Sequence, residues 1–193
     1  YQAAQLNYPA VSWITATDGV YFDKTAPTPT FGGLTVYYDI EDPSLEISLF
    51  NGGGDSSSDG GDSSGGGGAL PTTMIVDGNS ETPINTWRFQ TAGEHVVQYT
   101  FENNEIPQGF LDGINVAKEV IVGTDIVGIG GAAFNVALTS ATCLSTTPPS
   151  IEDETVFANN WQDYPIYVPS SAVNTYKTAS IWTSLASRIQ AIQ

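Results

Sequence analysis

The residues that could do acid–base chemistry in this sequence are mainly carboxylates. His95 is the only histidine, so any Ser-His-Asp triad, His-rich metal site or histidine proton shuttle must use it. It follows Glu94 beside a predicted hairpin turn, and no G-x-S-x-G motif supplies a nucleophile elsewhere. This setting favours an ordinary exposed strand residue over a catalytic one.

Two groups of acids have the residue types needed for glycoside hydrolysis. Glu102 lies three residues before Glu105, and Glu152, Asp153 and Glu154 are consecutive. A glycosidase uses one carboxylic acid as proton donor and a second carboxylate as nucleophile or base, at a defined separation in space. Acids that are neighbours in loops are usually solvated surface, and the chain contains 21 Asp and Glu residues. A hydrolase therefore stands as an alternative behind a binding function.

The single cysteine, Cys143, lies in "SATCLS" without Lys, Arg or His nearby in the sequence. A nucleophilic thiolate needs positive charge in its surroundings. We therefore predict a small buried residue on a strand.

Residues 128–133, "GIGGAA", have the G-x-G-x-x-A form of a dinucleotide-binding turn. The following "FNVALTSATCLSTTPPS" is too rich in Ser, Thr and Pro for the helix that would hold a pyrophosphate. A repeat turn fits the segment better, and we predict no cofactor.

Residues 51–68, "NGGGDSSSDGGDSSGGGG", contain regularly spaced oxygen ligands. Asp55, Asp59 and Asp62 are the candidates for attracting a cation such as calcium. The twelfth position of a calcium loop, where a glutamate closes the site, is Gly66 here. A plain flexible linker is the favoured interpretation.

Aromatic side chains are the candidates for ligand contact, because rings stack on sugars and anchor protein interfaces. A strand-rich module also needs rings to fill its core, and the sequence favours the core over contact. The candidates are Tyr8, Trp13, Tyr21, Tyr37 and Trp161.

The charge of the chain limits its partners. Five Lys and Arg against 21 Asp and Glu give a formal net charge of −16, which repels nucleic acids and anionic lipid surfaces. The longest apolar run, 120–129, is interrupted by Gly123, Thr124, Asp125 and Gly128. We therefore expect a soluble protein without membrane insertion.

The composition divides the chain into three parts. Residues 1–50 are predicted to form a short β module, with a hairpin over residues 34–50. Residues 51–69 form a Gly/Ser/Asp-rich tether. Residues 70–193 begin with a β-hairpin and continue as a repeat domain. A module of about fifty residues is near the lower limit for independent folding, so we expect it to self-associate or dock on another protein.

A repeat of solenoid type is indicated by the spacing of Ile106 and Ile129, which are 23 positions apart. Each unit runs into a short apolar strand, at residues 120–122 and 141–144. The C-terminal "IYVPSSAVNTYKTASIWTSLASRIQAI" predicts a strand, an N-cap at Ser170 or Ser171, and a helical cap. Five apolar residues would cover the last coil: Val173, Tyr176, Ile181, Leu185 and Ile189. The fold class is β-rich (α+β), with a short leucine-rich-repeat-like solenoid.

Several stretches carry a resemblance to a known family: "FQTAGEHVVQYTF", "IPQGF", "IVGIGGAAF", "CLSTTPPSI" and, above all, "IYVPSSAVNTYKTASIWTSLASRI". They cover residues 70–193, which resemble the BspA-like leucine-rich-repeat proteins. The resemblance implies a non-catalytic domain exposed on the surface of gut or oral bacteria or of their phages, with adhesion to host proteins or glycans. It implies no residue-level binding motif.

The sequence thus predicts a non-enzymatic, extracellular recognition or adhesion protein on a bacterial surface, with a protein or glycan ligand. The first alternative is a phage virion fibre or capsid decoration protein. The second is the glycan-active hydrolase with paired carboxylates.

Overall fold

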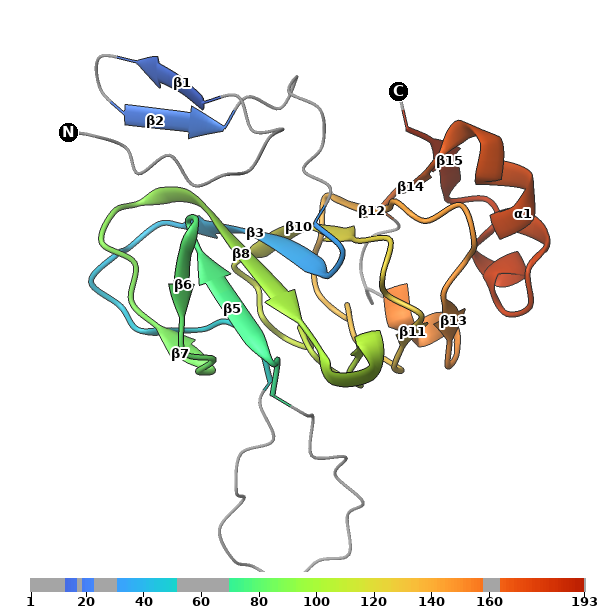
Figure 1. The fold of residues 1–193 in the computed structure, drawn as a ribbon, viewed down its shortest axis with the longest axis horizontal. Helices are drawn as coiled ribbons and strands as arrows, with labels where there is room; N and C mark the ends of the chain where they lie inside the picture. The colour runs from blue at the N-terminus through green and yellow to red at the C-terminus, as the bar shows by residue number, and fades with distance from the viewer. Residues whose placement is uncertain (1–12, 17–18, 23–30, 52–69, 158–163, 193) are drawn as a thin grey trace, which may run out of the picture.

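The computed structural model describes residues 13–16, 19–22, 31–51, 70–157 and 164–192 (Figure 1). These residues are rich in strands, and the one α-helix among them, α1 (Val173–Thr178), lies near the C-terminus. Two strands near the N-terminus, β1 (Trp13–Ala16) and β2 (Gly19–Phe22), form an antiparallel pair. The predicted β-rich fold class is confirmed.

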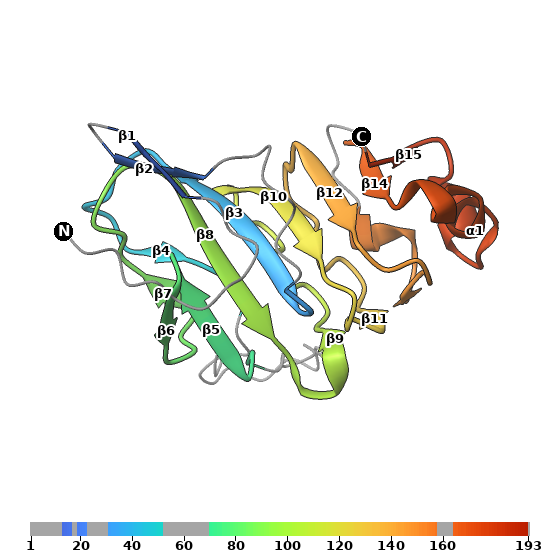
Figure 2. The same ribbon diagram turned by 45° about the horizontal axis from the view of Figure 1, so that its top comes forward.

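An eight-stranded mixed sheet forms the main layer, with the order β15-β14-β12-β10-β3-β8-β5-β6 (Figure 2). Strands β6, β5, β8 and β3 pair antiparallel, and β3 also pairs antiparallel with β10. From β10 to β15 all pairs are parallel. The strands are β3 (Leu34–Ile40), β5 (Thr73–Val76), β6 (Asn79–Glu81), β8 (Gly93–Thr100), β10 (Ala117–Val122), β12 (Ser140–Cys143), β14 (Ile166–Val168) and β15 (Ile189–Ala191).

Strand β3 lies inside this sheet, between β8 and β10. The predicted hairpin over residues 34–50 is therefore wrong. Strand β4 (Ile47–Ser48) pairs with β7 (Thr86–Trp87) instead of returning along β3. Both edges of β3 are already occupied by strands that are distant in the sequence. The alternation of apolar residues identified the strand, but alternation does not specify its partner.

Residues 34–50 of the predicted first part share one core with the later strands, because β3 contributes Leu34, Val36 and Tyr38 to the same buried cluster. Residues on either side of the Gly/Ser/Asp tract form backbone hydrogen bonds with residues 100–110. The backbone N–H of Asn51 donates to the carbonyl of Phe110 over 2.8 Å, and that of Thr72 donates to Thr100 over 2.8 Å.

A second, three-stranded parallel sheet contains β9 (Glu105–Ile106), β11 (Gly128–Ile129) and β13 (Ser150–Ile151). Ile129 pairs in register with Ile106 on one side and Ile151 on the other, and all three are buried. The predicted equivalence of Ile106 and Ile129 is therefore confirmed. In the large sheet, Ala141 pairs likewise with Val120 and Ile166.

The C-terminal segment covers the end of these ladders with a 3₁₀ turn, η3 (Ser170–Ala172), helix α1, and a second 3₁₀ turn, η4 (Trp182–Leu185). The predicted N-cap is wrong, because Ser170 and Ser171 lie inside η3, and no side chain caps either η3 or α1. Tyr176 and Leu185 are buried as predicted.

Ile181 departs from the predicted covering face, since its side chain is 37% exposed. Its φ of 66° and ψ of −43°, with a 2.8 Å hydrogen bond from the Trp182 N–H to the Ser180 carbonyl, describe a classic γ-turn. This turn reverses the chain so that Trp182, rather than Ile181, enters the core. Helical spacing could not reveal it, because α1 ends at Thr178.

A buried hydroxyl pair links β3 to β8. The Tyr38 hydroxyl donates to the Leu49 carbonyl over 2.5 Å and lies 2.9 Å from the Tyr99 hydroxyl. Since Tyr38 has a single hydroxyl proton, Tyr99 must be the donor to Tyr38.

We expect Tyr38→Phe to lower the free energy of unfolding more than Tyr99→Phe. The first change leaves both the Leu49 carbonyl and the Tyr99 hydroxyl without their partner, at about 1–3 kcal/mol for each buried group. Tyr99→Phe removes only the hydroxyl that donates to Tyr38, and the hydrogen bond from Tyr38 to the Leu49 carbonyl remains. Urea denaturation of both variants and of the double variant measures the difference. Equal losses, or strictly additive ones, would contradict the assigned direction of the hydrogen bonds.

Candidate functional site

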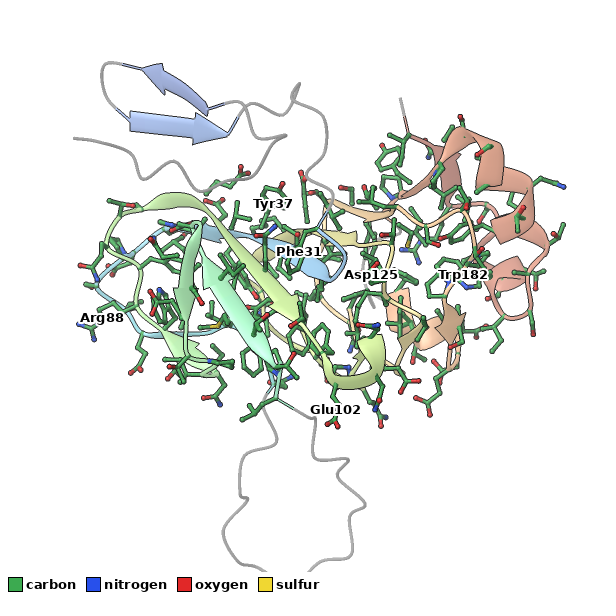
Figure 3. The ribbon with its side chains drawn as sticks, viewed as in Figure 1. Phe31, Tyr37, Arg88, Glu102, Asp125 and Trp182 are labelled. Carbon is green, nitrogen blue, oxygen red and sulfur yellow. The ribbon has the colours of Figure 1, made fainter. Side chains whose placement is uncertain are left out.

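A groove of about 540 Å³ crosses the outer side of the three-stranded sheet. It is lined by residues from three successive passes of the chain, with Glu102 at the rim of the molecule (Figure 3). The lining residues are Glu102, Asn103, Glu105, Ile106, Pro107, Gln108, Gly128, Ile129, Gly130, Ser150, Ile151 and Glu152.

Gly128 on the middle strand lets the side chains of both neighbouring strands approach each other closely. A Cβ added at Gly128 would lie 3.2 Å from Glu105 Cγ and 3.2 Å from Ser150 Oγ. Glu105 and Ser150 are the residues that pair in register with Gly128 on either side. The outer strands therefore supply Glu105 and Ser150, whose side chains close over Gly128, and a side chain at this position would collide with both.

The polar groups of the groove are negative or neutral. Glu102, Glu105 and Glu152 contribute carboxylates, and no Lys, Arg or His lines it. Glu152 is oriented by the Gly131 N–H, which donates to its Oε2 over 2.8 Å. The Ser150 hydroxyl donates to the Val127 carbonyl over 3.0 Å. Such a groove can accept hydrogen bonds from hydroxyl or ammonium groups and attracts positive charge.

The predicted acid groups are partly brought together here. Glu102, Glu105 and Glu152 line one groove although Glu152 is distant in the sequence. Asp153 and Glu154 do not line it, and Asp153 Oδ1 instead accepts the Thr155 backbone N–H over 2.8 Å. The 23-residue spacing of Ile106 and Ile129 was the signal that could have placed Glu105 and Gly128 on one row, whereas Ser150 follows Gly128 by 22 residues.

His95 serves the fold rather than a site. The prediction of an exposed strand residue is wrong, because the residue is only 8% exposed. Its Nδ1 lies 2.7 Å from Asp77 Oδ2, and its Nε2 lies 2.9 Å from the Thr91 carbonyl. The ring also stacks on Phe89 with 4.1 Å between centroids. Since both nitrogens face acceptors, the ring ties together the turns that flank β8 and β5.

Cys143 is buried on β12, as predicted. Burial raises the pKa of its thiol from 9.0 to about 12, so the thiolate that nucleophilic chemistry requires is disfavoured.

The "GIGGAA" segment forms β11 and a turn, and no helix follows it directly in the described chain. Gly131 N–H, which a pyrophosphate-binding turn would direct at its ligand, is bonded to Glu152. The segment is the groove floor and the turn after it.

Most other candidates fall where the structure gives no side-chain placement. Asp55, Asp59, Asp62, Tyr8 and Trp161 lie outside the described residues. For Trp13 on β1 and Tyr21 on β2 only the backbone pairing is described.

Tyr37 is described, and its side chain is buried. Burial raises the pKa of its hydroxyl to about 12, and the nearby charges of Glu94 and Glu119 add to the effect. The ring is a core residue on β3 rather than an exposed contact.

Among the described residues, no group of three His, Cys, Asp or Glu side chains is placed to hold a metal ion. Within the same residues, no helix has the length and apolar character to span a membrane.

Comparison with known proteins adds no assignment. No family model matches the chain, and no curated protein matches it either.

Proposed function

We propose that this chain is a non-enzymatic recognition domain displayed outside the cell, which binds a protein or glycan ligand in the groove over β9, β11 and β13. The observation that carries the proposal is the groove itself, whose polar lining comes from three strands held in parallel register. Fixed walls hold polar groups in place before a ligand arrives, which reduces the entropy lost on binding.

The proposal includes a short solenoid over residues 105–191. The parallel registers Ile106–Ile129–Ile151 and Val120–Ala141–Ile166–Ile189 support it. In such an architecture each pass of the chain buries its apolar side on the next, and a terminal element closes the stack. The C-terminal segment with Trp182 fits that role. Display on a bacterial surface, or on a virion, follows from the resemblance to BspA-like proteins.

A glycan-active hydrolase is the second candidate, and one observation favours it. Glu102, Glu105 and Glu152 line the same groove, and glycoside hydrolysis needs two carboxylates on either side of the scissile bond. Turnover of a bound glycan that is abolished by Glu105→Gln or Glu152→Gln would favour the hydrolase over the recognition domain.

We expect Gly128→Leu to abolish ligand binding, because the new side chain would collide with Glu105 and Ser150 and displace these two lining residues. Binding is measured on glycan arrays and on arrays of extracellular matrix proteins. Ser80→Leu, which places the same side chain on the exposed strand β6, is the matched control. If Gly128→Leu binds every ligand as well as the unmodified chain, the groove is not the site. Thermal melting of both variants verifies folding.

A further inference from the structure

We infer that residues 1–30 of this chain dock on the large sheet, on the face that is turned away from the main buried cluster. We call this surface the far face. The groove belongs to the other, three-stranded sheet, so the inference goes beyond the proposed recognition function and does not depend on it. It assigns an interaction surface and its occupant, which is the N-terminal segment of the same chain.

Two side chains of β3 are buried on the far face. Leu34, Val36 and Tyr38 belong to the main buried cluster. Because side chains alternate along a strand, Thr35 and Tyr37 project to the opposite side. They are nevertheless only 3% and 6% exposed, and Tyr37 is not a member of the main cluster. A second layer therefore covers the sheet at β3.

The strands beside β3 do not supply this layer. Tyr37 lies in register between Val96 of β8 and Glu119 of β10. Neighbouring strands shield the sides of such a residue, but its outward end is covered only by something that lies on the face of the sheet. The strands of the three-stranded sheet, β9, β11 and β13, contribute their buried isoleucines to the main cluster and therefore lie on the opposite side. The cover over Tyr37 must come from another part of the chain.

The N-terminal segment is long enough to reach the far face. The backbone N–H of Gly123 donates to the Gly33 carbonyl over 2.7 Å, which fixes the entry to β3 beside the end of β10. From Phe31 to Tyr37 an extended chain advances about 20 Å. Phe22, the last residue of β2, precedes Phe31 by nine positions, which span up to about 30 Å. The connection can therefore bring β1 and β2 back over Tyr37.

The hairpin of β1 and β2 needs a surface to pack on. A two-stranded hairpin by itself is at best marginally stable in water. Trp13 pairs in register with Phe22, and Thr15 pairs with Val20. Directly opposed residues of an antiparallel pair share one face, so one face of the hairpin is mostly apolar. Docking this face over Tyr37 would meet the need of the hairpin and the need of β3 together.

Charge and tethering favour this segment over a second copy of the chain. The whole chain carries a formal net charge of −16, whereas residues 1–30 contain two acids and one base, Lys24. Glu94 and Glu119 are close enough to Tyr37 for their charges to act on its hydroxyl, and Lys24 brings the opposite charge to this surface. Two complete chains repel each other, and a tethered segment docks at the effective concentration set by its connection.

Hydroxyl-radical footprinting of the full chain, analysed by tandem mass spectrometry, tests the inference. Trp13→Asp/Phe22→Asp places two charges on the proposed contact face of the hairpin. We expect the oxidation of Tyr37 to rise at least about threefold in this variant, because release of the segment opens the far face. Tyr38 and Tyr99 belong to the main cluster, and their continued protection verifies that the rest of the chain stays folded.

The matched control is Ile14→Asp/Tyr21→Asp, which adds the same charge to the other face of the hairpin. We expect it to leave the oxidation of Tyr37 unchanged. No rise in Trp13→Asp/Phe22→Asp would refute the inference, and an equal rise in both variants would refute the assigned contact face. If the unmodified chain loses the protection of Tyr37 on dilution, together with a fall in its sedimentation coefficient, the occupant is a second copy and the inference is wrong.

Discussion

Trp182→Ala is expected to lower the free energy of unfolding by about 3–5 kcal/mol, the usual cost of truncating a large buried aromatic residue. The Trp182 side chain is 1% exposed. Its ring lies 4.9 Å from Tyr176 in an edge-on arrangement and 5.4 Å from Phe157, measured between centroids. Because these rings join the C-terminal segment to the preceding pass of the chain, alanine would leave a cavity at that junction (Figure 3).

Trp182→Phe separates packing from hydrogen bonding. The indole N–H donates to the Pro149 carbonyl over 2.9 Å, and phenylalanine keeps most of the ring without this donor. We expect it to cost about 1–3 kcal/mol, the price of one buried acceptor left unpaired. Urea denaturation of the two variants measures both values. A loss below about 1 kcal/mol for Trp182→Ala would show that the segment does not close the core.

Pro149 connects the Trp182 side chain to the groove. It immediately precedes Ser150, one wall of the groove. The indole therefore holds the start of β13 from the core side, while the groove lies on the outer side. In the Trp182→Phe variant, weaker binding of a ligand of the groove with little loss of secondary structure would show that the C-terminal segment positions the groove wall.

The local features of the fold could be predicted from the sequence, whereas the strand partners could not. The apolar alternation in β3 and the equivalence of Ile106 and Ile129 depend on short segments and on one repeat distance. The pairing of β3 with β8 and β10 depends on strands separated by the Gly/Ser/Asp tract, and a low-complexity tract looks the same in a linker and in a loop. The composition of residues 51–69 therefore suggested a boundary between parts that share one core.

The candidate site was predictable in its residue types but not in its assembly. The acids at 102, 105 and 152 were identified as candidates for chemistry from their type alone. Their meeting in one groove depends on β11 lying between β9 and β13. Gly128 was interpreted only as part of a turn, since a glycine that lets neighbouring strands pack closely and a glycine that permits a bend look alike in a sequence. His95 was misplaced because its partner Asp77 comes from another hairpin.

Alkaline pH is expected to unfold this protein steeply above pH 10. Burial raises the pKa of five tyrosine hydroxyls above their usual value of 10.0: Tyr37, Tyr38, Tyr99, Tyr164 and Tyr176. A tyrosine whose pKa is higher in the folded chain binds its proton more tightly there than in the unfolded chain. The tyrosines therefore leave stability unaffected below pH 10 and lower it as the pH rises from 10 toward their folded-state pKa values.

The size of the effect follows from the number of groups. One pH unit above 10, each fully protected tyrosine favours the unfolded chain by about 1.4 kcal/mol. The effects of several such groups add in the same direction, against a total stability of about 5–15 kcal/mol for a typical domain. Cys143 acts in the same direction, because burial raises its pKa from 9.0 to about 12.

Tyrosinate absorbance and circular dichroism, recorded on the same alkaline titration, test this expectation. If burial protects the hydroxyls, the absorbance of the protected tyrosines rises together with the loss of secondary structure, in one cooperative step. Tyr99→Phe removes one protected hydroxyl, so the dependence of stability on pH above 10 should become shallower by about 1.4 kcal/mol per pH unit. Gradual ionisation of all tyrosines from pH 10 in a chain that keeps its circular dichroism would show instead that water reaches the hydroxyls, and that the aromatic core between the sheets is open.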